Sequence, residues 1–288
     1  MSTVLITGSS TGIGFASALA FARAGHTVAA TMRNPSRAPE LADVATRERL
    51  PIKVFKMDVD SDASVVDAIA RIGDTMGAID VLVNNAGIER MGSVEELPLA
   101  DFRAVMETNY FGVIRCIQAI LPSMRARGSG CIINIASVAG HIAMAPMASY
   151  TASKFALEAL SECLAQEVKP FGIRVAIVEP GIIDTQMARS IGTAYAPSPY
   201  PHRHRNAAFF ATALQNPASP SLVGDKVLEI ATSNLWQLRH PVGPDAAPFL
   251  GWRRQMSDEA WVDFGALDDN AWLDRVKTDF GLDARPAM

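Results

Sequence analysis

The chain has 288 residues, of which 49% are hydrophobic, and carries a formal net charge of −4 at pH 7. This length and composition can bury a large core, and we expect a single domain over residues 1–288 with a peripheral extension. The negative charge and a pI near 5.8 argue against a broad phosphate-binding surface. The short basic run HRHR at 202–205 does not change this, so no nucleic-acid partner is expected.

Nothing in the sequence predicts a membrane protein or a secreted one. No stretch approaches the roughly 18 uncharged apolar residues that a membrane helix needs. The first strand-like run starts at Thr3, which leaves no room for a signal peptide. Cys116, Cys131 and Cys163 are odd in number, widely spaced and set in apolar surroundings, so we interpret them as buried thiols of a reducing cytoplasm.

Short apolar runs alternate with longer helical patterns along the first two thirds of the chain. Their continuous hydrophobicity indicates strands buried on both faces, and the helices between them imply right-handed crossovers. The fold class is therefore α/β with a doubly wound parallel sheet. The expected strands are TVLIT at 3–7, TVAATM at 27–32, IKVFKMDV at 52–59, VLVN at 81–84, CIINIAS at 131–137 and RVAIVEP at 174–180.

The regular alternation stops at residues 186–222. This segment carries five prolines, and a loop of that length inside a compact domain is usually functional, so we expect a substrate lid. Beyond it, 226–235 is expected to be helical and 238–243 a strand. The C-terminal extension, 246–288, is rich in tryptophan, and we expect its aromatic side chains to pack it onto the body; a pocket wall or a subunit contact are the alternatives.

The first strand runs into a glycine-rich turn, TGSSTGIG at 7–14. Gly8 allows a tight turn, Gly12 permits close approach of a phosphate, and Gly14 lets the following helix pack against the strand. The helix N-terminus then presents unpaired N–H groups and a positive dipole end to a pyrophosphate. The flanking strand and helix make this a stronger signal than three glycines alone.

Tyr150 and Lys154 lie one turn apart on a predicted helix and can share one face. A nearby cation favours the phenolate, so the phenol could exchange a proton closer to neutral pH. Alone, the pair is better explained as an ordinary helix with a surface lysine. Whether the pair has a catalytic role depends on the motifs in the rest of the chain.

Combined with the GxxxGxG turn, the YTASK motif makes residues 3–185 resemble the short-chain dehydrogenase/reductase family of the one-domain type. The branch that it resembles contains hydroxysteroid and retinol dehydrogenases. The resemblance implies a Rossmann-like sheet of strand order 3-2-1-4-5-6-7 with helices on both faces. It also implies a cytoplasmic homodimer or homotetramer built through helices around 102–126 and 150–168.

The family's catalytic residues fall on four positions of this sequence. The resemblance implies that Tyr150 is the general acid for reduction and the base for oxidation, and that Lys154 lowers its pKa and holds the ribose of the nicotinamide. Ser137 would donate a hydrogen bond to the substrate carbonyl. Asn109 would help to hold a water chain that carries protons to solvent.

The second strand ends at Met32 and Arg33, where NAD-dependent relatives carry an acidic residue that holds the ribose 2′-hydroxyl. Arg33 suits a 2′-phosphate instead, so NADP(H) is preferred and NAD(H) remains possible. The cofactor contacts implied by the resemblance are Gly8, Ser10, Thr11, Gly12, Ile13, Gly14, Arg33, Asp58, Val59, Asn85, Ala86, Gly87, Tyr150, Lys154, Pro180, Gly181, Ile183 and Thr185.

The expected substrate is a hydrophobic ketone or secondary alcohol, because the segment 138–148 is apolar and supplies adaptable methionines. No chemical role is expected for His141 in this wall. Glu89 with Arg90 is expected to form a solvated pair, and the alternative is that the two face a polar tail of the substrate. A catalytically silent dinucleotide sensor and a sugar-nucleotide epimerase or dehydratase are the rival functions. No metal site is expected, since His202 and His204 lack partners at ligand spacing.

Overall fold

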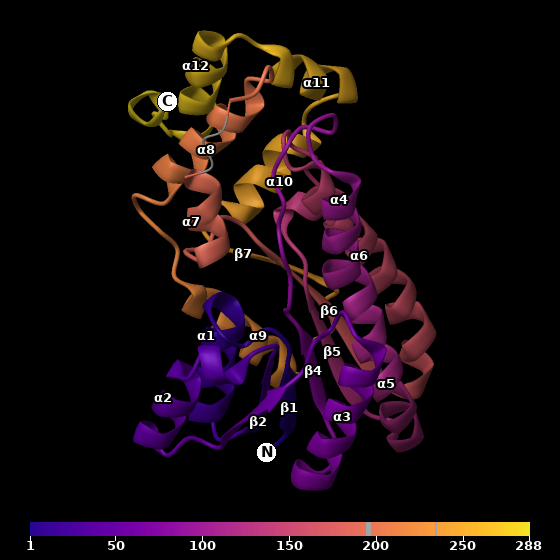
Figure 1. Ribbon diagram of the computed structural model, residues 1–288. Coiled ribbons are helices and arrows are strands. Elements are labelled where there is room, and N and C mark those ends of the chain that lie inside the picture. Colours follow the sequence, from indigo (N-terminus) through magenta and orange to yellow (C-terminus); the bar gives the residue numbers. More distant parts are fainter. Residues whose placement is uncertain (194–196, 234) are drawn as a thin grey trace.

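Seven parallel strands form one sheet in the order β3-β2-β1-β4-β5-β6-β7, which confirms the expected topology (Figure 1). The computed structural model describes residues 1–193, 197–233 and 235–288. The strands are β1 (Thr3–Ile6), β2 (Thr27–Met32), β3 (Ile52–Lys56), β4 (Val81–Asn84), β5 (Gly130–Ile135), β6 (Ile173–Pro180) and β7 (Arg239–Val242).

Helices cover both faces of the sheet. One face carries α1 (Gly12–Arg23), α2 (Glu40–Glu48) and α9 (Pro220–Thr232). The other carries α3 (Asp62–Met76), α5 (Gly112–Arg127) and α6 (Ala148–Val168), and α4 (Leu99–Met106) packs on α6.

The central strands are largely apolar because each face of the sheet meets its own core. In β1, Leu5 enters the core under α3, α5 and α6, whereas Val4 and Ile6 enter the core under α1, α2 and α9. In β6, Ile177 and Val178 divide in the same way. Alternating side chains of a strand point to opposite faces, so burial on both sides requires an unbroken apolar run.

The expectation of an irregular segment at 186–222 was wrong. It contains α7 (Gln186–Gly192) and α8 (His202–Ala213) and leads into α9, which starts earlier than the helix expected at 226. The prolines lie between the helices or at their first turns, where the missing N–H and the fixed φ are tolerated. Residues 194–196 of the expected lid and 234 of the expected helix lie outside the described residues.

The C-terminal extension forms three helices, α10 (Ala246–Arg254), α11 (Asp258–Ala266) and α12 (Asp269–Phe280). The side chains of Ser257 and Asp268 cap the N-termini of α11 and α12. Together with α8 the three helices enclose a separate aromatic core that includes Phe209, Phe264 and Trp272. In Figure 1 this helical layer stands over one end of the sheet, in orange and yellow.

Two of the three cysteines are buried, as expected from the sequence. Cys116 and Cys131 are buried, and burial raises the pKa of their thiols to about 12 and about 11. Cys163 is exposed on α6, so its expected burial was wrong. Among the described helices, none is both long and apolar enough to span a bilayer.

Candidate active site

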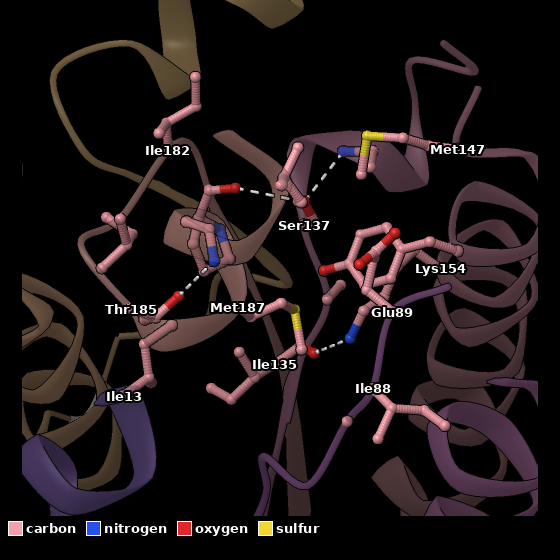
Figure 2. Close-up of a pocket in the computed structure, with 18 of the residues that line it drawn as sticks. Ile13, Ile88, Glu89, Ile135, Ser137, Met147, Lys154, Ile182, Thr185 and Met187 are labelled. Carbon is pink, nitrogen blue, oxygen red and sulfur yellow. Dashed lines mark hydrogen bonds between the residues drawn. The ribbon is translucent and has the colours of Figure 1, made fainter. Parts of the chain in front are cut away.

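A cavity of about 380 Å³ lies at the carboxyl ends of the parallel strands, where open α/β sheets bind ligands. The turn after β1 and the ends of β2 to β6 line one part of it, and α7, α8 and the C-terminal helices line the other. Figure 2 shows Ser137, Lys154 and Glu89 among the side chains on its wall. The cavity therefore has two ends. We call them the glycine-turn end and, where α8 and the C-terminal helices line it with aromatic side chains, the aromatic end.

At the glycine-turn end the backbone fits the roles expected for the three glycines. Gly8 and Gly12 have φ of +67° and +58°, a conformation that favours glycine. A Cβ on Gly8 would lie 2.8 Å from Cα of Ala86, and one on Gly14 would overlap the carbonyl oxygen of Gly8. The side chain of Thr11 makes no capping hydrogen bond, so the first N–H groups of α1 are left to bind an anion.

Asn85 ties this turn to the end of β4. Its side-chain amide donates to the carbonyl oxygens of Thr7 at 2.9 Å and Gly8 at 3.0 Å. The hydroxyl of Thr7 in turn accepts hydrogen bonds from the backbone N–H groups of Asn85 and Ala86, each at 2.9 Å. The turn is thus held rigidly before any ligand arrives.

Most residues of the expected cofactor set line the cavity, and two of the expected site residues do not. Arg33 is exposed at the rim, and its guanidinium has no hydrogen bond or ion pair with any described residue. Gly14 and Asn109 lie behind the wall. The lining residues from the set are Gly8, Ser10, Thr11, Gly12, Ile13, Arg33, Asp58, Val59, Asn85, Ala86, Gly87, Tyr150, Lys154, Pro180, Gly181, Ile183 and Thr185.

Ser137, Tyr150 and Lys154 meet where the two ends of the cavity join. Lys154 is buried, its ammonium lies 5.5 Å from the centroid of the Tyr150 ring, and it donates to the carbonyl oxygen of Ile135 at 2.8 Å. The hydroxyl of Ser137 accepts from the N–H of Ala139 at 3.1 Å and faces the phenol. A hydroxyl, a phenol and an ammonium therefore converge on one point.

The expected lowering of the Tyr150 pKa by Lys154 is not what the structure shows. Burial raises the pKa of Tyr150 to about 12, the hydrogen bond with Ser137 opposes this, and the charge of Glu89 adds to it. Burial also lowers the pKa of Lys154 to about 8, against the effect of Glu158. Both shifts have one cause, since a low-polarity environment disfavours the charged form of each group.

Asn109 connects the cavity wall to α6. It lies in a π-helical turn, Glu107–Phe111, and is buried. Its side chain accepts from the N–H of Ile88 at 2.8 Å and donates to the carbonyl of Ile88 at 2.9 Å and to the hydroxyl of Ser153 at 3.0 Å. In this arrangement Asn109 positions the strand end that precedes Glu89.

Behind Ser137 lies a charged cluster that sequence reasoning missed. His141 contacts Glu179 at 2.8 Å and Glu158 at 3.6 Å, and both carboxylates are buried. The two glutamates raise the pKa of His141 to about 9. Three ligand atoms within 4.8 Å could suit a cation, but Arg239 lies 3.0 Å from Glu158 and 3.8 Å from Glu179, so the cluster already balances its charge.

Aromatic side chains from α8 and the C-terminal helices form the aromatic end of the cavity. These side chains pack the extension against α8 in a core of their own, and they also line the cavity, which was the expected alternative of a pocket wall. The spacing of Phe249 and Trp252, and of Trp261 and Phe264, is the three-residue step of one helix face, which was the available signal. The wall consists of Phe209, Phe210, Phe249, Trp252, Trp261, Phe264, Trp272 and Phe280.

Glu89 does not form the solvated pair that was expected. It lines the cavity and is partly buried, whereas Arg90 is exposed and contacts Asp101 at 3.4 Å. The only hydrogen bond between the two neighbours that involves a side chain runs from Arg90 to the backbone carbonyl of Glu89.

Comparison with known proteins gives matches over most of the chain. The family model described as short chain dehydrogenase matches residues 2–196. Oxidoreductase BOA17 of Botryotinia fuckeliana is 34% identical over 89% of this chain and 95% of its own, and retinol dehydrogenase 8 of Bos taurus is 36% identical over 80% and 75%. The structure of a gluconate 5-dehydrogenase from Burkholderia cenocepacia, in complex with NADP and tartrate, covers 85% of this chain and 95% of its own with a TM-score of 0.74 and 30% identity.

Proposed function

This chain belongs to the short-chain dehydrogenase family of oxidoreductases, which act on CH–OH donors, and we propose that it transfers a hydride between NADP(H) and a hydrophobic ketone or secondary alcohol. One observation carries the proposal: Ser137, Tyr150 and Lys154 converge between a glycine-turn end and an aromatic end of a single cavity. A dinucleotide suits the first end and an apolar carbonyl compound suits the second.

The glycine-turn end has the features that a dinucleotide requires. The positions of Gly8 and Gly14 admit no side chain, and the uncapped start of α1 offers N–H groups to a pyrophosphate. Asp58 and Val59 would receive the adenine, and Ile183 and Thr185 the nicotinamide. Bound there, the cofactor would supply or accept the hydride.

Arg33 supports a preference for NADP(H) over NAD(H). Its guanidinium makes no hydrogen bond or ion pair with any described residue and lies at the end of β2, where the 2′-phosphate of the ribose would be received. The neighbour from Burkholderia cenocepacia was solved with NADP. Replacing Arg33 with Asp should lower the ratio of kcat/KM for NADPH over NADH roughly 10- to 100-fold, the effect of losing one charged hydrogen bond. An unchanged ratio contradicts the preference.

The reacting group would be held by the protein's own donors. The Ser137 hydroxyl would donate to the carbonyl oxygen and orient it, and Tyr150, protonated at neutral pH because of its raised pKa, would give that oxygen its proton. Lys154 would place positive charge beside the phenol as it loses the proton. The lid helices and the aromatic wall would keep water from the reacting carbon.

The test is NADPH oxidation by the purified protein with a panel of steroid, retinoid and small aromatic ketones, followed at 340 nm as absorbance loss. We expect turnover with several apolar ketones and little with charged ones. Cofactor binding without turnover of any ketone or alcohol would instead support a silent sensor.

We also propose a homodimer or homotetramer. Phe111 before α5 and Phe155 on α6 are 44% and 43% exposed, on the helices through which relatives are implied to associate. Light scattering should give two or four times the chain mass, and Phe155→Glu should reduce it. A monomer at micromolar concentration contradicts the proposal.

A further inference from the structure

The carboxylate of Glu89 has no partner in the described part of the chain. Glu89 follows β4 and the Asn84–Gly87 segment, and Figure 2 shows it on the cavity wall near Lys154. Its Oε1 is buried without a hydrogen bond, and no described residue donates to Oε2 or forms an ion pair with either oxygen. The side chain thus brings an unused acceptor to the cavity.

An unpaired carboxylate in such a position is costly, because a buried charge needs hydrogen bonds or an opposite charge to replace the water it has lost. Burial raises the pKa of Glu89, and the charges of Arg90 and Arg203 only partly oppose this. The guanidinium of Arg90 is engaged with Asp101 and with the backbone of Glu89 itself. Arg203 contributes an opposite charge, but it makes no hydrogen bond or ion pair with Glu89. The protein therefore leaves this carboxylate without a hydrogen bond from its own described groups.

Glu89 and Tyr150 line the same cavity. The negative charge of Glu89 is among the causes that raise the pKa of the phenol. Because Glu89 lies on the wall of the same cavity, a substrate whose carbonyl is bound by Tyr150 and Ser137 can present a neighbouring group to its carboxylate. An apolar group there would leave the carboxylate unpaired, whereas a hydrogen-bond donor would satisfy it.

We propose that Glu89 is a specificity-determining residue that selects carbonyl substrates bearing a hydrogen-bond donor, a hydroxyl or a protonated amine, close to the reacting carbon. The substrate class is then a hydroxy ketone or an amino ketone with an apolar body, together with the corresponding diol or amino alcohol. The aromatic wall, with Trp252 and Phe280, accommodates the apolar body. This inference rests on the proposed function and names the substrate class of the same site.

The test compares three ketones with one carbon skeleton: propiophenone, 2-hydroxypropiophenone and 2-aminopropiophenone, each reduced with NADPH. We expect kcat/KM to be roughly 10- to 100-fold higher for at least one donor-bearing ketone than for propiophenone. Glu89→Leu removes the acceptor and should abolish this ratio. Glu89→Gln keeps an acceptor without the charge, so it should retain preference for a hydroxyl and lose preference for an ammonium.

Glu167→Gln is the matched control, because Glu167 is an exposed glutamate on α6, the helix that carries Tyr150. It should keep the wild-type ratio, and thermal unfolding of every variant checks that the fold is intact. Removing the charge at Glu89 should also shift the rise of alcohol oxidation with pH to lower pH, since the phenol would ionise more easily.

Equal kcat/KM for the three ketones in the wild type, or an unchanged ratio in Glu89→Leu, overturns this inference while leaving the proposed function intact. Failure of the proposed function gives a different result, since none of the three ketones would then be reduced with either cofactor.

Discussion

The two ends of the cavity are built in different ways. The glycine-turn end is made of the turn after β1 and the ends of neighbouring strands, and its shape depends on where a side chain is missing, as at Gly8 and Gly14. The aromatic end is made of side chains from α8, α10, α11 and α12, which pack on one another. The first end suits a ligand common to many enzymes, and the second a ligand particular to this one.

This difference explains where each residue's influence should be felt. A change at the glycine turn should alter cofactor binding for every substrate, because a rigid backbone leaves no alternative arrangement. A change in the aromatic wall should alter substrates selectively. Tyr150 lies at the junction, and its substitution should stop the reaction while leaving both ends in place.

Tyr150→Phe therefore has the largest expected effect. Loss of the proton donor should lower kcat for ketone reduction by roughly 10²- to 10⁴-fold, the usual contribution of general acid catalysis. The Kd for NADPH, measured by fluorescence titration, should stay within about twofold, since all the other expected cofactor contacts are unchanged. Tyr110→Phe, outside the cavity lining, is the control and should keep full activity. Retained turnover in Tyr150→Phe removes the assigned acid.

Gly14→Ala should damage the glycine-turn end alone. The new Cβ would overlap the carbonyl of Gly8 and the amide of Asn85, so we expect a loss of about 1–3 kcal/mol in the free energy of unfolding and weaker NADPH binding. Gly73→Ala on α3 is the matched control, because nothing lies within 4 Å of its Cβ and helix propensity should stabilise it by about 1 kcal/mol. Equal effects of both changes in urea unfolding would refute the steric argument.

What could be predicted from the sequence follows the same division. The sheet order and the glycine turn were predictable because apolar runs and glycine spacing are local and act through the backbone. The proximity of Tyr150 and Lys154 followed from one helical turn. The raised pKa of Tyr150 was not predictable, because it depends on burial and on the charge of Glu89, a residue that follows β4 and is distant in sequence.

The remaining misses have a similar cause. Prolines suggested an irregular lid, yet they fall between helices, and only packing of α8 against the extension decides that the segment is helical. The exposure of Cys163 and the cluster around His141 depend on which face of a loop or helix meets a neighbour. Side-chain orientation is set by tertiary packing, which a local pattern does not contain.

Trp261→Ala should damage the aromatic end alone. Trp261 stacks with Phe264, and its indole N–H donates to the carbonyl of Ala143 at 2.9 Å, which joins the extension to the wall near Ser137. We expect KM for a bulky ketone to rise about 10-fold, and KM for a small ketone and the Kd for NADPH to change little. Trp236→Ala is the control, since Trp236 is 49% exposed and lies outside the cavity. A uniform fall in activity towards all ketones would show that the two ends are not separable.

The smallest expected effect concerns the cluster that supports the junction from behind. Glu158, Glu179 and Arg239 face His141, and the two glutamates raise its pKa from 6.5 to about 9. A raised folded pKa contributes stability that is complete below pH 6.5 and is lost as pH rises through about 9. The unfolding free energy should therefore fall by about 1 kcal/mol over this range, allowing for solvent screening of a partly exposed ring.

His141→Gln should remove that slope in urea unfolding at several pH values, whereas His202→Gln should keep it, because that ring contacts the carbonyl of Gly265 and no described carboxylate. If His141→Gln retains the slope, another group titrates there, and the cluster does not hold the Ser137 segment by charge.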